Sequence, residues 1–188
     1  LVRALRGTTV TVSHGLAQSL EQFGREPDQF RADALAFMDG LVAHYVLDDG
    51  RLVVAHAGLK EEYHGRTSAR VRAFALYGDT SGETDEYGLP VRYPWAQDYR
   101  GKAMVVYGHT PVPSAQWLNN TICLDTGAVF GGALTALRYP ERQIVSVPAQ
   151  QQWYEPIRPL GVPSTDRQPS VLRLDDVSGT RWLDSTRA

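Results

Sequence analysis

The chain has 188 residues, of which 43% are hydrophobic and 21% are charged, and its formal net charge is -2. These values are typical of a globular protein, and the near-neutral charge excludes a protein that binds nucleic acid over its whole surface. A single cysteine, Cys123, excludes an intrachain disulfide and a cysteine-rich zinc site. No apolar run approaches the roughly 20 residues of a membrane span, and the missing initiator methionine predicts a segment of a longer protein.

The first 50 residues have a helical pattern, and strand patterns dominate after them. We expect a strand at 8–12, helices at 13–20, 27–47 and 60–77, and strands at 52–55, 103–107, 121–125, 134–138 and 144–147. The last two strands should pair as an antiparallel hairpin, and the polar loop over 78–100 has a length typical of a functional or a poorly ordered loop. The predicted fold class is α/β, with a helical N-terminal part and a mostly β second half that form one lobe of a sandwich.

Two histidines occupy matched positions in this pattern. His56 ends the apolar run Val53-Val54-Ala55, and His109 follows the run 105–108. The carboxyl ends of strands in an α/β sheet form the crevice where ligands bind, so the two imidazoles could converge on one metal ion. The alternative is a pair of ordinary loop histidines, and the spacing by itself leaves both interpretations open.

A carboxylate ends a third strand. Asp125 follows an apolar run and precedes Thr-Gly, where it could bind metal, orient a ligand histidine, or cap the turn. The segments 78–80 and 82–85 are similar to a Gly-Asp metal motif, but they follow no apolar strand and are predicted to form an acidic loop. His44 is expected to be structural on a helix and His64 to be exposed.

Three segments together resemble the last motifs of calcineurin-like metallophosphoesterases: 54–59 with His-Ala-Gly, 107–112 with Gly-His-Thr-Pro, and 123–132 with Asp-Thr-Gly. Residues 60–62, 77–90 and 137–142 look like the phosphatase module of bacterial polynucleotide kinase-phosphatase. This resemblance covers about residues 1–160, and it implies the C-terminal half of that module. Residues 161–188 would then be a linker and the start of an incomplete ligase-side segment.

The resemblance also implies roles for particular residues. His56 and His109 would bind one of two divalent metals, typically manganese in that family, and Asp125 would be an active-site carboxylate beside them. Arg92 would contact phosphate. The substrates would be phosphorylated RNA ends bearing a 2′,3′-cyclic phosphate or a 2′-phosphate, with kinase and ligase modules in the same parent chain, no membrane, and a cytoplasmic location.

The family's first three motifs, Asp-x-His, Gly-Asp-x-x-Asp-Arg-Gly and Gly-Asn-His-Asp, do not occur in this chain. Their absence predicts that the chain by itself has negligible phosphatase activity and leaves an apolar sheet face exposed. Two alternatives stay open. The first is a fragment of a phosphoprotein phosphatase or a diadenosine tetraphosphatase, which share the late motifs; the second is a non-catalytic binding fragment.

Overall fold

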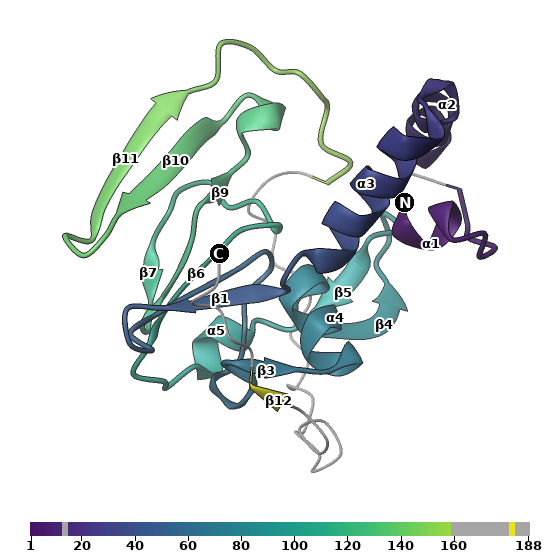
Figure 1. The fold of residues 1–188 in the computed structure, drawn as a ribbon. Coiled ribbons are helices and arrows are strands. Elements are labelled where there is room, and N and C mark those ends of the chain that lie inside the picture. The colour runs from purple at the N-terminus through teal and green to yellow at the C-terminus, as the bar shows by residue number, and fades with distance from the viewer. Residues whose placement is uncertain (13–14, 159–180, 183–188) are drawn as a thin grey trace. The chain divides into compact units, whose positions relative to one another are not determined.

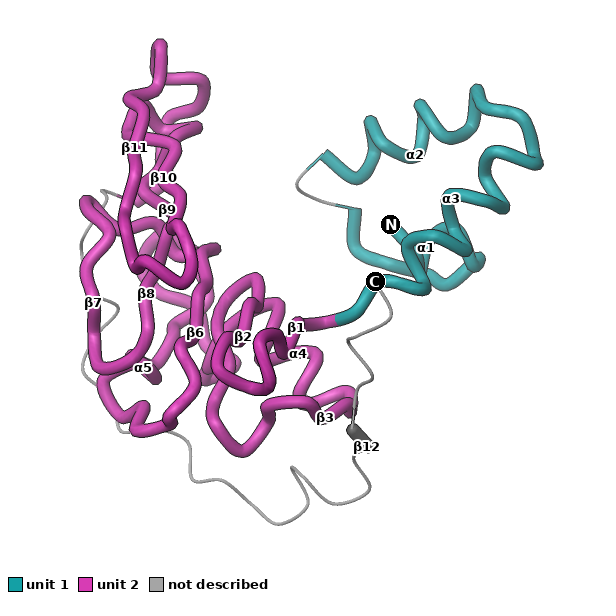
Figure 2. The backbone as a smooth tube through the Cα atoms, turned by 60° about the vertical axis from the view of Figure 1, so that its left-hand side comes forward, with its two compact units in different colours: residues 1–42 teal, residues 43–188 magenta. Residues whose placement is uncertain are grey.

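The computed structural model describes residues 1–12, 15–158 and 181–182, and the chain divides into two compact units, Leu1–Val42 and Ala43–Ala188 (Figures 1 and 2). The linker and incomplete ligase-side segment predicted over residues 161–188 lie outside the described residues, except for residues 181–182. The short strand β12 (Arg181–Trp182) pairs antiparallel with β3 (Arg66–Thr67).

The first unit is helical. It consists of α1 (Val2–Leu5), α2 (Leu16–Arg25) and α3 (Asp28–Gly40). The rings of Phe23 and Phe30 pack 6.0 Å apart, and Arg6 forms an ion pair with Asp39 at 2.6 Å. None of the residues described in these three helices is buried. This unit therefore has little core of its own.

The second unit is built on a five-stranded mixed sheet in the order β1-β2-β6-β8-β7. The strands are β1 (His44–Leu47), β2 (Leu52–Ala55), β6 (Met104–Tyr107), β7 (Trp117–Leu118) and β8 (Thr121–Cys123). Strands β2, β6 and β8 run parallel, whereas the two edge strands pair antiparallel. The predicted α/β class is confirmed.

A second sheet of three strands follows, in the order β11-β10-β9. It contains β9 (Asp125–Thr126), β10 (Ala133–Arg138) and β11 (Gln143–Pro148), and the last two form the predicted antiparallel hairpin. Only Leu124 separates β8 from β9, so the chain passes from one sheet to the other immediately before Asp125 (Figure 1). The expected single strand 121–125 is therefore two short strands in two sheets.

The core lies between the five-stranded sheet and the helices α4 (Ala69–Tyr77) and α5 (Trp95–Asp98). Val53 and Val105 of the central strands are fully buried, and Phe74 and Trp95 meet edge-to-face at 6.0 Å. The hydroxyl of Ser68 caps α4 by accepting a hydrogen bond from the amide of Val71. These contacts hold α4 and α5 against β2 and β6, the strands that lead to His56 and His109.

Apolar surface remains exposed on the three-stranded sheet. Leu134 of β10 is 70% exposed and its cross-strand partner Val147 is 64% exposed. On the five-stranded sheet, Val54 and Val106 keep partial exposure on the face opposite Val53 and Val105. Apolar residues are thus more exposed on the hairpin of β10 and β11 than on the central strands β2 and β6, because α4 and α5 cover one face of β2 and β6.

Several predicted elements are wrong in detail. The strand expected at 8–12 does not form, and α3 ends at Gly40, so His44 and Tyr45 lie on strand β1. The region 60–67 contains the short 3-10 turn Glu61–Tyr63 and β3, and α4 begins only at Ala69. The loop at 78–100 contains a hairpin of β4 (Thr80–Thr84) and β5 (Pro90–Arg92) before α5.

Candidate active site

The site forms where three parallel strands end at one edge of the sheet. His56 follows β2 directly, His109 comes just after β6, and Asp125 begins β9 just after β8. Because β2, β6 and β8 are parallel neighbours, their carboxyl ends lie side by side. The order of the strands therefore gathers residues that are far apart in the sequence.

The two imidazoles are in contact. Nε2 of His56 lies 2.8 Å from Nδ1 of His109, and the ring centroids are 4.6 Å apart. The backbone supports this contact, because the amide of Gly108 donates to the carbonyl of His56 at 2.9 Å. His109 has a φ of 72°, in the left-handed region that a non-glycine residue rarely adopts and that clusters at functional sites. The structure therefore brings together the two histidines singled out by the sequence.

Arg92 at the end of β5 contacts His109 and so extends the histidine pair. Its Nη2 lies 3.0 Å from Nε2 of His109, and its Nε donates to the carbonyl of Tyr77 at 3.0 Å. A guanidinium can only donate, so Nε2 of His109 is the acceptor. The proton of the neutral His109 ring then resides on Nδ1, from which it is donated to Nε2 of His56. This chain of hydrogen bonds fixes the orientation of both rings.

The environment keeps His109 uncharged at neutral pH. Burial, followed by the nearby charges of Arg92 and His56, lowers the pKa of His109 to about 4, and Asp125 acts in the opposite direction. Burial also lowers the pKa of Arg92, and so does the positive charge of Arg158. A neutral imidazole is the form that binds a metal ion, although in this tautomer the lone pair of His109 lies on Nε2 and accepts a hydrogen bond from Arg92.

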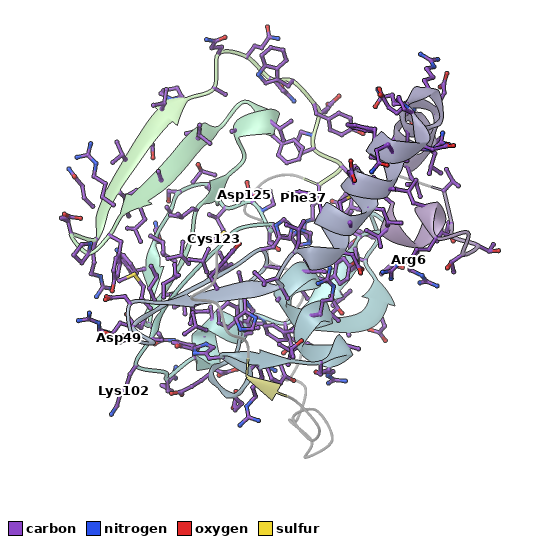
Figure 3. All side chains as sticks on the ribbon, viewed as in Figure 1. Arg6, Phe37, Asp49, Lys102, Cys123 and Asp125 are labelled. Carbon is purple, nitrogen blue, oxygen red and sulfur yellow. The ribbon has the colours of Figure 1, made fainter. Side chains whose placement is uncertain are left out.

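Asp125 lies next to this pair, and its carboxylate caps a turn. The amide of Gly127 donates to Oδ1 of Asp125 at 3.1 Å, which is the capping role considered from the sequence. The side chain packs on Gly108, where an added Cβ would lie 3.3 Å from the Cβ of Asp125. Figure 3 labels Asp125 and Cys123. The metal-ligand and active-site roles of His56, His109, Asp125 and Arg92 stay predictions.

The donor set fits a metal ion only in part. Two ligands bonded at about 2.0–2.1 Å to an octahedral ion and at right angles to each other lie roughly 2.9 Å apart, close to the 2.8 Å between the two histidine nitrogens. Within residues 1–12, 15–158 and 181–182, however, no three His, Cys, Asp or Glu side chains are close enough to hold an ion. The described residues thus offer two candidate ligands and not a complete site.

A buried ion pair beside the site was missed in the sequence. Asp79, which was expected in an exposed acidic loop, is 5% exposed, and its Oδ2 lies 2.7 Å from Nζ of Lys60. The ammonium of Lys60 also lies 5.2 Å from the centroid of the Phe74 ring. The loop was predicted to be exposed because its composition is polar, and no sequence signal links Asp79 to Lys60.

The other histidines also differ from expectation. His44 is buried on β1, where its Nε2 accepts a hydrogen bond from the amide of Gly65 at 3.1 Å. His64 is half-buried and packs against Tyr99 with ring centroids 6.0 Å apart. The sequence placed His44 on a helix because the apolar spacing of α3 continues past its end.

Known proteins resemble this chain over most of its length. No protein-family model matches it. The bis(5'-nucleosyl)-tetraphosphatase PrpE [asymmetrical] of Anoxybacillus flavithermus is 44% identical over 165 residues, which are 85% of this chain and 67% of that protein. The chain belongs to the PrpE family. The protein of the same description from Geobacillus thermodenitrificans is 47% identical over 79% of this chain and 62% of its own length.

A solved structure is also similar. It is a crystal structure of a protein provisionally described as a diadenosine tetraphosphatase, with 24% identity and a TM-score of 0.48, over 79% of this chain and 72% of that protein. The chain spans about two thirds of the length of the PrpE relatives.

These relatives correct the resemblance stated above. The expected link to polynucleotide kinase-phosphatase is wrong, because 85% of the chain matches a PrpE protein at 44% identity. The His-Ala-Gly, Gly-His-Thr-Pro and Asp-Thr-Gly motifs identify a phosphoesterase but do not distinguish its subfamilies. The predicted hydrolase class agrees with the family. RNA ends as substrate, and kinase and ligase modules, were expected only from the overturned resemblance and lose their basis with it.

Among the helices of the described residues, none has both the length and the apolar character that crossing a membrane requires.

Proposed function

We propose that this chain takes part in the asymmetrical hydrolysis of bis(5'-nucleosyl) tetraphosphates, as the names of its relatives state for those proteins. The observation that carries the proposal is the 2.8 Å contact between His56 and His109 beside Arg92, in a chain 44% identical to a tetraphosphatase. Splitting a bridge of four phosphates unequally gives a nucleoside triphosphate and a nucleoside monophosphate. A water oxygen bonds to phosphorus, one bridging P–O bond breaks, and the water protons pass to solvent or to the leaving phosphate.

We assign a separate role to each residue of the candidate site. His56 and His109 would hold a divalent metal ion through Nε2 and Nδ1 as neutral imidazoles, so the ring proton of His109 would then lie on Nε2, which would no longer accept a hydrogen bond from Arg92. The bound ion would supply Lewis-acid polarisation of the phosphate and activation of the attacking water. Arg92, held by its hydrogen bond to the carbonyl of Tyr77, would present positive charge for a phosphate oxygen.

Manganese is our proposal for the ion, although imidazole also suits iron, nickel and zinc and the two histidines by themselves do not select among these metals. With two imidazoles and no third ligand among the described residues, we expect weak metal binding and negligible hydrolysis by this chain alone. Isothermal titration calorimetry with MnCl₂ tests the metal ligands. His109→Ala should abolish the heat of binding, whereas His64→Ala, which alters a histidine outside the site, should preserve it.

The substrate is tested in a chimera in which this chain replaces the matched segment of the Anoxybacillus flavithermus relative. With MnCl₂, the chimera should convert diadenosine tetraphosphate to ATP and AMP, resolved by anion-exchange chromatography, and His109→Ala should reduce the rate at least about 100-fold. A folded chimera that leaves diadenosine tetraphosphate intact but hydrolyses a phosphopeptide would overturn the proposal. Fast hydrolysis by the chain alone, lost in His109→Ala, would support the substrate and refute only the expectation of negligible hydrolysis.

A further inference from the structure

A cavity of about 340 Å³ opens beside the histidine pair. Arg92, which contacts His109, and Thr110, which follows it, both line the cavity. The cavity therefore begins where the proposed phosphate site ends. Its volume lies at the lower end of the range of about 300–1,000 Å³ for small-molecule sites.

Six side-chain rings, three of them aromatic, line part of the cavity. They are contributed by the following residues: Tyr93, Pro94, Trp95, Tyr107, Pro111 and Pro113. Trp95 is 7% exposed, and its ring centroid lies 5.1 Å from that of Tyr107, so these walls are held in place by the core. Leu118 of β7 adds an exposed apolar edge. Flat, preformed, apolar walls of this kind suit a planar aromatic ligand.

The charged residues that line the cavity are two arginines and Asp79, whose carboxylate pairs with Lys60. Arg158 lines it together with Arg92, and Arg158 is held by an ion pair with Oδ2 of Asp85 at 3.2 Å. Arg158 lies close enough to Arg92 for its charge to lower the pKa of Arg92. Two guanidiniums beside apolar walls match a ligand with a flat ring at one end and phosphate at the other.

We propose that this cavity binds one nucleoside of the substrate, the one that leaves as the nucleoside monophosphate. The proposal rests on the proposed function. Because Arg92 belongs to both the cavity and the histidine site, a nucleoside in the cavity is separated from His109 by a short link. In an unequal split, the nucleoside nearest the cleaved bond keeps a single phosphate. Apolar rings contact the face of any base, so the subsite should accept adenine and guanine with similar affinity.

The test measures binding and not hydrolysis. Isothermal titration calorimetry on this chain compares AMP, ribose 5-phosphate and inorganic phosphate. AMP should bind at least about tenfold more tightly than ribose 5-phosphate, because stacking of a base on aromatic side chains contributes about 1–3 kcal/mol. Equal affinities for AMP and ribose 5-phosphate would overturn the proposal, since the base would then make no contact.

A matched pair of variants locates the subsite. Leu118→Asp places a carboxylate at the apolar edge and should weaken AMP binding about tenfold while leaving ribose 5-phosphate unchanged. Leu118→Ala, a milder change, should weaken AMP binding by a smaller factor in the same direction. Leu134→Asp changes an exposed strand leucine outside the cavity and should have no effect. Equal losses in Leu118→Asp and Leu134→Asp, with circular dichroism unchanged, would refute the location.

The two proposals fail separately. A chimera that does not hydrolyse diadenosine tetraphosphate, combined with a preference for AMP over ribose 5-phosphate, would remove the proposed function and keep the nucleoside subsite. A chimera that hydrolyses diadenosine tetraphosphate, combined with equal affinities of this chain for AMP and ribose 5-phosphate, would keep the proposed function and remove the nucleoside subsite.

Discussion

Gly58, two residues after His56, should be intolerant of even a methyl group. Its φ is +111°, a backbone conformation that L-residues rarely adopt, and a Cβ built there would lie 2.2 Å from Cζ2 of Trp95. Trp95 is buried and its ring is held between Phe74 and Tyr107, so it has little room to move. Gly58→Ala therefore combines backbone strain with overpacking.

The expected cost has two parts. The left-handed backbone costs an alanine about 1–2 kcal/mol, and forcing a methyl group into a packed core adds about 1–3 kcal/mol. We expect Gly58→Ala to lower the free energy of unfolding by about 3 kcal/mol, measured by urea denaturation followed by circular dichroism.

Gly82→Ala is the control. Gly82 also has a positive φ, +86°, but an added Cβ would meet nothing within 4 Å, so only the backbone cost of about 1–2 kcal/mol applies. If the two variants lost the same stability, the contact between Gly58 and Trp95 would not be a tight one, and the packing of the cavity wall would need revision.

Three further predictions concern the core and the second sheet. Burial and the charge of His64 lower the pKa of His44 from 6.5 to about 4, so His44 takes up a proton at a higher pH in the unfolded chain than in the folded one. The free energy of unfolding should therefore be highest above pH 6.5 and fall by about 3 kcal/mol towards pH 4. Urea denaturation across this pH range should show a smaller fall in His44→Gln. Lys60→Met leaves the Asp79 carboxylate buried without its cation and should cost about 3 kcal/mol at pH 7, much of it recovered when Asp79→Leu is added; an uncoupled double-mutant cycle would contradict this. Thr135→Val interrupts the hydroxyl contacts at 2.7 and 2.8 Å to the neighbouring strands and should lower the unfolding free energy by about 1 kcal/mol, a loss that thermal denaturation would detect.

Some of the fold could be read directly from local patterns. The apolar runs at 52–55 and 103–107 predicted strands because they are short, continuous and bounded by turn residues, and the hairpin of β10 and β11 followed from the runs at 134–138 and 144–147 joined by a tight turn. Strand β1 was not predicted. The turn that joins it to β2 contains Asp48 and Asp49, both with positive φ, followed by Gly50. An Asp-Gly turn is a hairpin signal, and it was interpreted as a helix end instead.

In the candidate site, too, some features follow from the sequence and others only from the tertiary structure. The sequence itself determined that His56 and His109 follow buried strands, and that their motifs indicate a phosphoesterase, because both properties depend on neighbours along the chain. Only the tertiary structure decided that Arg92 bonds to His109, that Asp79 is buried against Lys60, and that Arg158 reaches the cavity beside Arg92. These contacts join residues that are far apart in the sequence, and they are set by strand order and packing, which leave no periodic signal in the chain.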